Sequence, residues 1–193
     1  MIRVCHVTSV HPAKDARIFY KECVSLSKMY EVYLIAPDVQ DEIADGVHIV
    51  GVKLPKNRIK RVMGLKVIYE KALSIDASIY HFHDPELMKV GLKIQKRGKK
   101  IIFDSHEDIP RQILTKDYLP SWIRKPISLF YEVYEKMNLS RYDALISVTP
   151  FIVERLKKIN PLTVMITNFP TISQSSEPQV VKNGGGIFVL LAA

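Results

Sequence analysis

Short runs of apolar residues alternate along this chain with longer segments in which apolar residues recur every three or four positions. A compact apolar run predicts a buried strand, whereas a period of three to four predicts a helix with one buried face. The pattern predicts strands at residues 2–8, 31–36, 47–52, 77–83, 100–104, 143–148 and 162–167. It predicts helices at residues 16–29, 62–74, 85–97, 120–139 and 150–158.

Residues at the ends of these segments support the helices. Asp15 stands where the first helix needs an N-cap, and Thr149 directly precedes Pro150, which suits a first helical position. Gly98 suits the C-terminal cap of the helix at 85–97. Strands that alternate with helices form a parallel sheet covered on both faces, with right-handed crossovers. We therefore predict an α/β fold with a Rossmann-like doubly wound parallel sheet of about seven strands.

The composition changes after residue 168. Residues 169–186 contain Pro170, Pro178 and a glycine cluster, which is the composition of a linker. The apolar run that follows reads as a strand, and a strand with no helix after it cannot bury both of its faces. We predict a first domain at residues 1–168, an interdomain linker at 169–186, and the first strand of a truncated second domain at 187–193.

Several classes of protein lack their sequence signals here. No glycine occurs between Met1 and Asp45, so the first turn cannot be the glycine-rich loop of a nicotinamide or flavin dehydrogenase, nor the phosphate loop of a nucleoside triphosphatase. No Gly-x-Ser-x-Gly elbow supports a serine nucleophile. No apolar run reaches the roughly 20 residues that span a bilayer, and the start resembles a strand rather than a signal peptide. We expect a cytoplasmic protein in which Cys5 and Cys23 are reduced.

The formal net charge is +8, and positive residues gather in two groups. The first, here called the basic patch, comprises Lys53, Lys56, Arg58, Lys60 and Arg61. The second comprises Lys89, Lys93, Lys96, Arg97, Lys99 and Lys100. Each group is either a solvated surface or a site that attracts phosphates, and we favour an anionic membrane surface or a phosphorylated lipid over nucleic acid. Apolar residues after the basic patch, such as Val62 and Met63, would either enter a headgroup layer or form the buried stripe of a helix.

Two of the predicted strands, at residues 77–83 and 100–104, stop abruptly in histidine and carboxylate residues. The first continues into His83 and Asp84, and the second into His106, Glu107 and Asp108. In an open parallel sheet the carboxyl ends of the strands face a common crevice, where ligands bind. We therefore expect these polar residues to converge on one site.

Each of these residues has a structural and a functional interpretation. Asp84 either caps the next helix or binds a ligand. Asp104 would orient His106, which in the functional interpretation donates a hydrogen bond to a sugar hydroxyl or phosphate, with Glu107 or Asp108 as acceptor or candidate base.

The loop after the first strand adds His11, Asp15 and Arg17 to the expected site. A guanidinium at a helix start that faces a crevice suits an anionic ligand. The alternative is that Arg17 forms a salt bridge across its own helix.

A metal site is a second possibility. His81 and His83 point to the same side of their strand because side chains alternate. With His106 and either Asp104 or Asp108 they would supply the ligands of a metal-dependent hydrolase. A third possibility is a non-catalytic module that binds anionic ligands through its basic residues alone.

At these residues the chain resembles the amino-terminal half of a GT-B fold glycosyltransferase of the retaining family 4 type. The resemblance rests on HVTSVHPAKDARIFYKE in the first strand and helix, HFHDPEL and DSHED after the two polar strand ends, SVTPFIVERL near the sixth strand, and NFP before the linker. These motifs cover nearly the whole chain. In this order they are similar to bacterial enzymes of capsule, O-antigen or exopolysaccharide assembly.

The resemblance implies two facing Rossmann-like domains, with the acceptor held mainly by this one and a nucleotide-diphosphate sugar mainly by the second. It implies that His106 reaches the transferred sugar as the catalytic residue. It also implies that residues 11–17 close over the acceptor and the donor phosphates, although many relatives carry two glycines in that loop and this chain has none. The basic patch would touch the inner face of the plasma membrane, where a lipid-linked acceptor is met.

The mechanism implied by the resemblance is front-face retention, in which the leaving diphosphate helps to deprotonate the acceptor. This domain then needs no nucleophile, metal or cofactor of its own, and nucleic acid is not a partner. The substrate-binding residues would be His11, Asp15, Arg17, His83, Asp84, Glu107 and Asp108. Because the donor-site carboxylates belong to the second domain, residues 1–193 alone are expected to transfer no sugar.

Overall fold

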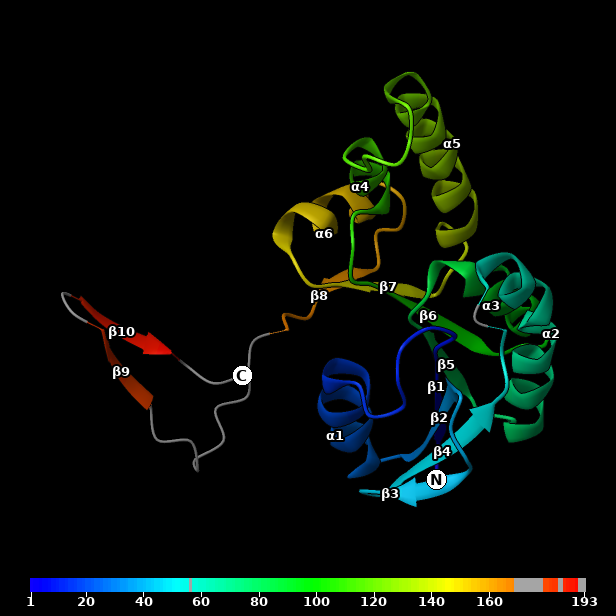
Figure 1. Ribbon diagram of the computed structural model, residues 1–193. Coiled ribbons are helices and arrows are strands. Elements are labelled where there is room, and N and C mark those ends of the chain that lie inside the picture. The colour runs from blue at the N-terminus through cyan, green and yellow to red at the C-terminus, as the bar shows by residue number, and fades with distance from the viewer. Residues whose placement is uncertain (56, 169–178, 184–185, 191–193) are drawn as a thin grey trace.

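The computed structural model describes residues 1–55, 57–168, 179–183 and 186–190. Its main feature is an eight-stranded sheet with the strand order β3-β4-β2-β1-β5-β6-β7-β8 (Figure 1). The strands are β1 (Arg3–Val7), β2 (Glu31–Pro37), β3 (Glu42–Ala44), β4 (Val47–Val52), β5 (Ile79–Phe82), β6 (Lys100–Ser105), β7 (Ala144–Ser147) and β8 (Thr163–Met165). Neighbouring strands in this sheet run parallel, except that β3 is antiparallel to β4.

Helices cover both faces of the sheet, as Figure 1 shows. They are η1 (Ala16–Cys23), α1 (Val24–Ser27), α2 (Arg58–Ile75), η2 (Pro85–Leu87), α3 (Met88–Gln95), α4 (Ile109–Leu114), α5 (Ser121–Leu139) and α6 (Pro150–Lys157). On one face Phe19 of η1 belongs to the same core as Leu34 of β2. On the other, Ile68 of α2 belongs to the same core as Phe82 of β5. The predicted doubly wound α/β class is therefore confirmed. The prediction of about seven strands missed β3, which is too short and too exposed to give a periodic signal.

The first helix, η1, is wound as a π-helix. Asp15 is its N-cap, as predicted, and its side chain accepts hydrogen bonds from the N–H groups of Arg17 at 2.8 Å and Ile18 at 2.9 Å. The N–H of Tyr20 donates to the carbonyl of Asp15, five residues earlier, at 3.3 Å. This wider winding brings residues five apart toward one face, whereas an α-helix does so for residues three or four apart. Arg17 and Glu22 consequently share a side of η1.

Two other helices differ from the sequence prediction. Helix α2 begins at Arg58 rather than at residue 62, so part of the basic patch is helical and not a loop. Helix α4 was not predicted, because it is short and carries a proline near its start. By contrast, the predicted cap at Thr149 is confirmed, since its hydroxyl accepts from the N–H of Ile152 at 3.4 Å. Of the helices described, none has the length and apolar character that crossing a membrane requires.

The end of the described chain forms a separate two-stranded antiparallel sheet of β9 (Gln179–Asn183) and β10 (Gly186–Leu190). Strand β9 therefore lies within the segment predicted as a linker. The preceding part of that linker, residues 169–178, and the last residues, 191–193, lie outside the described residues. The division into a first domain, a linker and a second domain stays a prediction.

The order of the strands determines where a ligand site can form. Strand β1 lies between β2 and β5, so the connections leave it in opposite directions. At such a switch point the loops after neighbouring strands diverge and leave a crevice at the carboxyl end of the sheet. The loops after β1, β5 and β6 surround this crevice.

Candidate functional site

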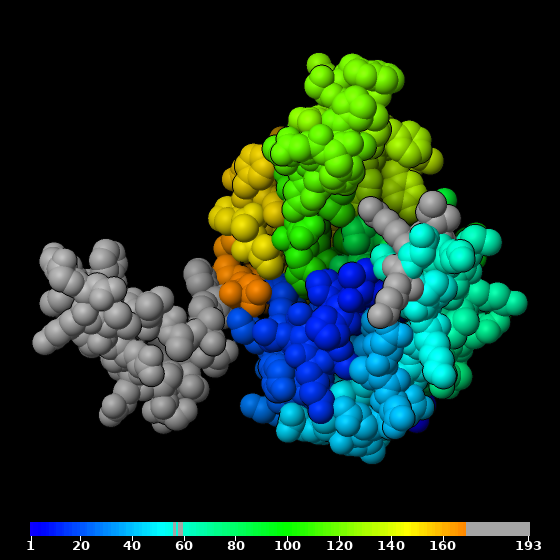
Figure 2. Space-filling view, in the orientation of Figure 1, coloured from blue at the N-terminus to red at the C-terminus, as the bar shows by residue number. Residues whose placement is uncertain are grey.

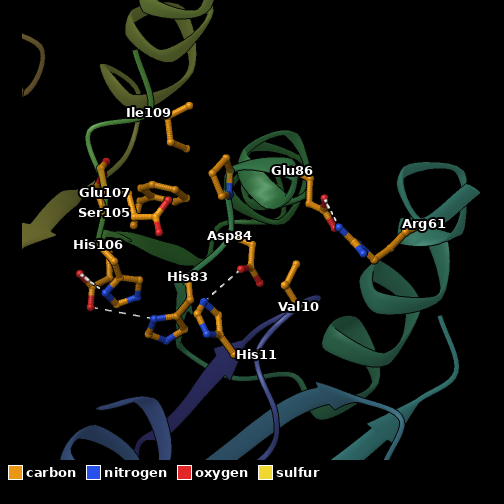
Figure 3. Close-up of a pocket in the computed structure, with 13 residues that line it drawn as sticks. Val10, His11, Arg61, His83, Asp84, Glu86, Ser105, His106, Glu107 and Ile109 are labelled. Atoms are coloured by element: carbon orange, nitrogen blue, oxygen red, sulfur yellow. Dashed lines mark hydrogen bonds and ion pairs between the residues drawn. The ribbon is translucent and has the colours of Figure 1, made fainter. Parts of the chain in front are cut away.

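A pocket of about 350 Å³ lies at the carboxyl ends of β1, β5 and β6 (Figure 3). In Figure 2 the first loop, in dark blue, lies against the green segment that follows β6. The residues that line the pocket are Val10, His11, Arg61, His83, Asp84, Pro85, Glu86, Phe103, Asp104, Ser105, His106, Glu107 and Ile109. The polar residues at the ends of β5 and β6 therefore lie together at the carboxyl edge of the sheet, as we predicted from its parallel strands.

Asp84 anchors the first loop to the end of β5. Its Oδ2 accepts hydrogen bonds from the hydroxyl of Thr8 at 2.7 Å and from the N–H of Ser9 at 2.6 Å. Its other oxygen lies 3.5 Å from Nε2 of His11. Asp84 occupies the N-cap position of the helix that follows, as one interpretation predicted, but its side chain makes no capping bond there. Its contacts instead hold His11 at the edge of the pocket (Figure 3).

His106 faces the pocket from the end of β6, with its ring stacked on that of His83 at 5.7 Å between centroids. Its Nδ1 lies 3.8 Å from Oδ1 of Asp104, close to the carboxylate but beyond hydrogen-bond distance, so the orienting role of Asp104 stays a prediction. Burial lowers the pKa of His106 below its ordinary value, although the Asp104 carboxylate opposes this shift. The ring is therefore neutral near pH 7 and has one N–H to donate and one nitrogen to accept.

Arg17 points into the protein rather than into the pocket. Its Nη2 lies 2.7 Å from Oδ2 of the fully buried Asp104, and its Nε lies 3.0 Å from Oε1 of Glu22. Its Nη1 donates to the carbonyl of Ile166 at 3.2 Å. The salt bridge across its own helix, which was the alternative interpretation of Arg17, is therefore present, and its partner is Glu22. The guanidinium ties η1 to β6, and this arrangement supports a positioning role for Arg17 over direct contact with an anionic ligand.

The other predicted site residues separate into two groups. His11, His83, Asp84, His106 and Glu107 line the pocket. Asp15 and Asp108 do not: Asp15 caps η1, and Oδ1 of Asp108 lies 3.4 Å from Nε of Arg155 on α6.

The basic patch is divided in a similar way. Arg61 turns into the pocket, where its Nε donates to Glu86 at 2.6 Å (Figure 3). Lys53 and Lys60 are exposed. The side chains of Lys56 and Arg58 lie outside the described residues.

The three histidines of the predicted metal site, His81, His83 and His106, are divided between two overlapping clusters. His83 lies close to Asp104 and His106 on one side, and close to His6, Glu22 and His81 on the other. His6 and Glu22 escaped the sequence prediction. His6 could have been noticed, because it is a polar residue in the middle of the central strand. It pairs in register with His81. Glu22 gave no such signal, because its inward direction depends on the π-winding of η1.

A sequence profile of glycosyltransferase family 4 matches residues 16–168, which is most of the chain. Among solved structures, the fold is similar to that of sucrose-phosphate synthase from Thermosynechococcus elongatus, with a TM-score of 0.64 and 13% identity over 86% of this chain and 48% of that one. It is also similar to a glycosyltransferase from Rickettsia africae, with a TM-score of 0.51 and 12% identity over 86% and 42% of the two chains. A third similar structure, described as trehalose-6-phosphate from E. coli bound with UDP-2-fluoro glucose, has a TM-score of 0.50 and 13% identity over 77% and 40%.

These similarities differ in what they establish. The structural matches, at such low identity, show likeness of fold. The chain spans less than half the length of each of the three. No curated protein sequence matches it.

Proposed function

This chain belongs to glycosyltransferase family 4, as the amino-terminal Rossmann-like domain of a GT-B fold, and we propose that it forms the acceptor-binding half of a retaining hexosyltransferase. The donor is a nucleotide-diphosphate sugar held mainly by a second domain. The acceptor is a growing saccharide or a lipid-linked saccharide in capsule, O-antigen or exopolysaccharide synthesis. The observation that supports this proposal is the pocket at the switch point, where His11, His83, His106 and Glu107 converge.

His106 is the residue that we assign to the reacting centre. It stands at the rim of β6 as a neutral imidazole, stacked on His83 and close to the buried Asp104. Stacking on His83 limits the directions of the ring, which favours an N–H that meets a sugar hydroxyl with little reorganisation. Positive charge develops on the transferred sugar, and a neutral ring avoids the repulsion that an imidazolium would cause there. No base is required from this domain if the leaving diphosphate takes the acceptor proton.

The remaining pocket residues bind the acceptor. Glu107 is exposed at the rim, where its carboxylate can accept from sugar hydroxyls. His11 is positioned over the pocket by the hydrogen bonds that Asp84 makes to the first loop. Arg61 and Glu86 form an ion pair at the opposite wall, so the pocket has a charged boundary on the side of α2. A pocket that combines histidine and carboxylate side chains with apolar ones suits a carbohydrate, which has both hydroxyl groups and C–H faces.

The surface of α2 supports peripheral binding to an anionic inner-membrane surface. Val62 and Met63 are exposed beside Lys60 and Lys66, which is the combination by which helices lie in a headgroup layer. Next to them is a groove of about 400 Å³ that Lys66, Lys89 and Lys93 line together with Tyr69 and Tyr134. Lysines at a membrane surface attract anionic lipids, and this would bring the pocket to a lipid-linked acceptor.

Transfer from radiolabelled nucleotide sugars tests the proposed reaction. We expect the native-length protein to transfer one sugar with retention, residues 1–193 alone to transfer none, and His106→Ala to lower kcat by about 100-fold or more. His48→Ala, which changes a histidine stacked on Tyr33 away from the pocket, is the matched control and should keep full activity. Full activity of His106→Ala, or transfer by residues 1–193 alone, would contradict the proposal.

Flotation with vesicles tests the membrane surface. We expect binding to vesicles that contain anionic lipid, no binding to neutral phosphatidylcholine vesicles, and loss of binding when Lys60 and Lys66 are changed to glutamate. The control, Lys116→Glu together with Lys157→Glu, changes net charge equally away from α2. Equal binding by both double variants would refute a specific role for this surface.

A further inference from the structure

Four buried or nearly buried side chains meet beneath the pocket floor, on the face of the sheet that η1 covers. They are His6 of β1, Glu22 of η1, and His81 and His83 from β5 and its end. His6 and His81 are register partners in neighbouring parallel strands, and His83 is two positions further on, so all three rings project from one face. The π-winding of η1 adds the Glu22 carboxylate above them.

The candidate ligand atoms of the four residues all lie within 4.8 Å of one another. Nδ1 of His6 and Nε2 of His83 are 3.0 Å apart. Oε2 of Glu22 lies 3.6 Å from Nδ1 of His6, 3.9 Å from Nδ1 of His81 and 3.8 Å from Nε2 of His83. A tetrahedron with zinc–nitrogen and zinc–oxygen bonds of about 2.0–2.1 Å has ligand atoms about 3.3 Å apart. The longer separations would have to contract by about half an ångström or more to bring the four atoms around one ion.

We propose that His6, Glu22, His81 and His83 bind a single zinc-class divalent cation in a closed tetrahedral site that joins β1, β5 and η1. Three imidazoles and one carboxylate are ligands that Zn²⁺ accepts in proteins. Because the protein supplies all four ligands, no position remains for a water molecule. The site is structural, and this separates it from the hydrolytic metal centre that the sequence suggested. It departs from the expectation that this domain holds no metal.

The polar atoms in the cluster favour an occupied site. Oε2 of Glu22 is buried and has no hydrogen-bond partner among the described residues. A buried oxygen left in this state is destabilising, and a cation at the centre of the cluster would satisfy it.

The surroundings of His83 also match a metal ligand. Its other nitrogen, Nδ1, lies 3.9 Å from Oδ2 of Asp104, beyond hydrogen-bond distance but on the side where metal-bound histidines commonly have a carboxylate. Asp104 in turn lies beside His106 and Arg17. The ion would thus fix the floor of the pocket, one contact away from His106. Glu22 is the one member of the cluster that is only partly buried.

Metal analysis of the protein purified without chelators tests the inference independently of sugar transfer. We expect about one equivalent of zinc per chain, and, after exchange for Co²⁺, an intense visible absorption typical of tetrahedral coordination. His6→Gln and Glu22→Gln should each weaken zinc affinity by at least about 100-fold, since loss of a mere supporting partner already costs 10–100-fold. His48→Gln is the control for a general histidine effect and His106→Gln the control for the second cluster; both should keep the metal.

Stability measurements cover the case in which a variant does not fold. Zinc should raise the Tm of the chelator-treated wild-type protein, because a ligand that binds only the folded state stabilises it. A wild-type protein that takes up no zinc, gives no cobalt band and shows no change in Tm overturns the inference. Loss of metal from His106→Gln with retention in His6→Gln overturns it in favour of the cluster around Asp104. Neither result would affect the proposed transferase activity.

Discussion

Asp84, at the end of β5, accepts a 2.6 Å hydrogen bond from the backbone N–H of Ser9, in the loop after β1. The two residues lie on opposite sides of the switch point, at the ends of neighbouring strands. One carboxylate thereby determines the course of the first loop and the place of His11 above the pocket.

Replacing Asp84 with asparagine should destabilise the protein by about 1.5–3 kcal/mol, because hydrogen bonds to a charged acceptor are lost in a buried place. Urea unfolding measures the change. Asp117→Asn removes a fully exposed carboxylate and should alter stability by less than about 0.5 kcal/mol. Asp84→Asn with the unfolding midpoint of the wild type would show that the first loop does not depend on this anchor.

Arg17→Met should cost about 3–5 kcal/mol, because it leaves Asp104 charged and fully buried without its counter-ion. The double variant Arg17→Met, Asp104→Asn should recover part of this loss, since the stranded charge is then gone. Free energies of unfolding for the two single variants and the double variant give the coupling between the residues. Additive effects would mean that Arg17 does not act through Asp104.

Two glycines in helices should respond to alanine in opposite ways. A Cβ at Gly91 of α3 would lie 2.2 Å from the hydroxyl of Tyr142, which itself donates to the carbonyl of Met88 at 2.9 Å. Gly91→Ala should therefore destabilise by about 1–3 kcal/mol through overpacking. At Gly64 of α2 the nearest atom would be 3.4 Å away, so Gly64→Ala should stabilise by about 0.4–1 kcal/mol. Urea unfolding of the pair checks the signs, and equal signs would contradict the packing seen around Gly91.

The stability contributed by Asp143 should depend on pH. Burial alone would raise the pKa of Asp143, but hydrogen bonds from Lys100, the N–H of Ile101 and Gln95 outweigh burial and lower it. A carboxyl with a lowered folded-state pKa stabilises the protein above its unfolded pKa of about 3.9, and this stabilisation is lost as pH falls through the lower folded value. We expect Asp143→Asn to cost about 1 kcal/mol or less at pH 7, since the group is partly exposed. Unfolding midpoints should show this gap closing below about pH 4; a gap that widens instead would reverse the sign of the shift.

Much of the fold could be predicted because it depends on local patterns. The apolar runs located the strands, Asp15 and Thr149 marked helix starts that the structure confirms, and the two polar strand ends indicated the crevice. Each of these inferences needs only neighbouring residues and the rule that parallel strands share a carboxyl edge.

The parts that escaped prediction depend on contacts between distant segments. Asp84 holds the first loop because its side chain bonds to Thr8 and Ser9, which precede it by more than seventy positions. The inward turn of Arg17 is decided by Asp104. A single sequence gives no register between strands and no winding of a helix, and so His6 and Glu22 could not be placed together.

The π-winding of η1 decides where one carboxylate points. In an α-helix each residue turns by about 100°, so positions five apart lie about 140° from one another. An α-helical winding of the same residues would therefore turn Glu22 away from the side of η1 that Arg17 occupies. The winding of one helix can thus separate the architecture of this domain from the chemistry under its pocket, without altering any of the three histidines.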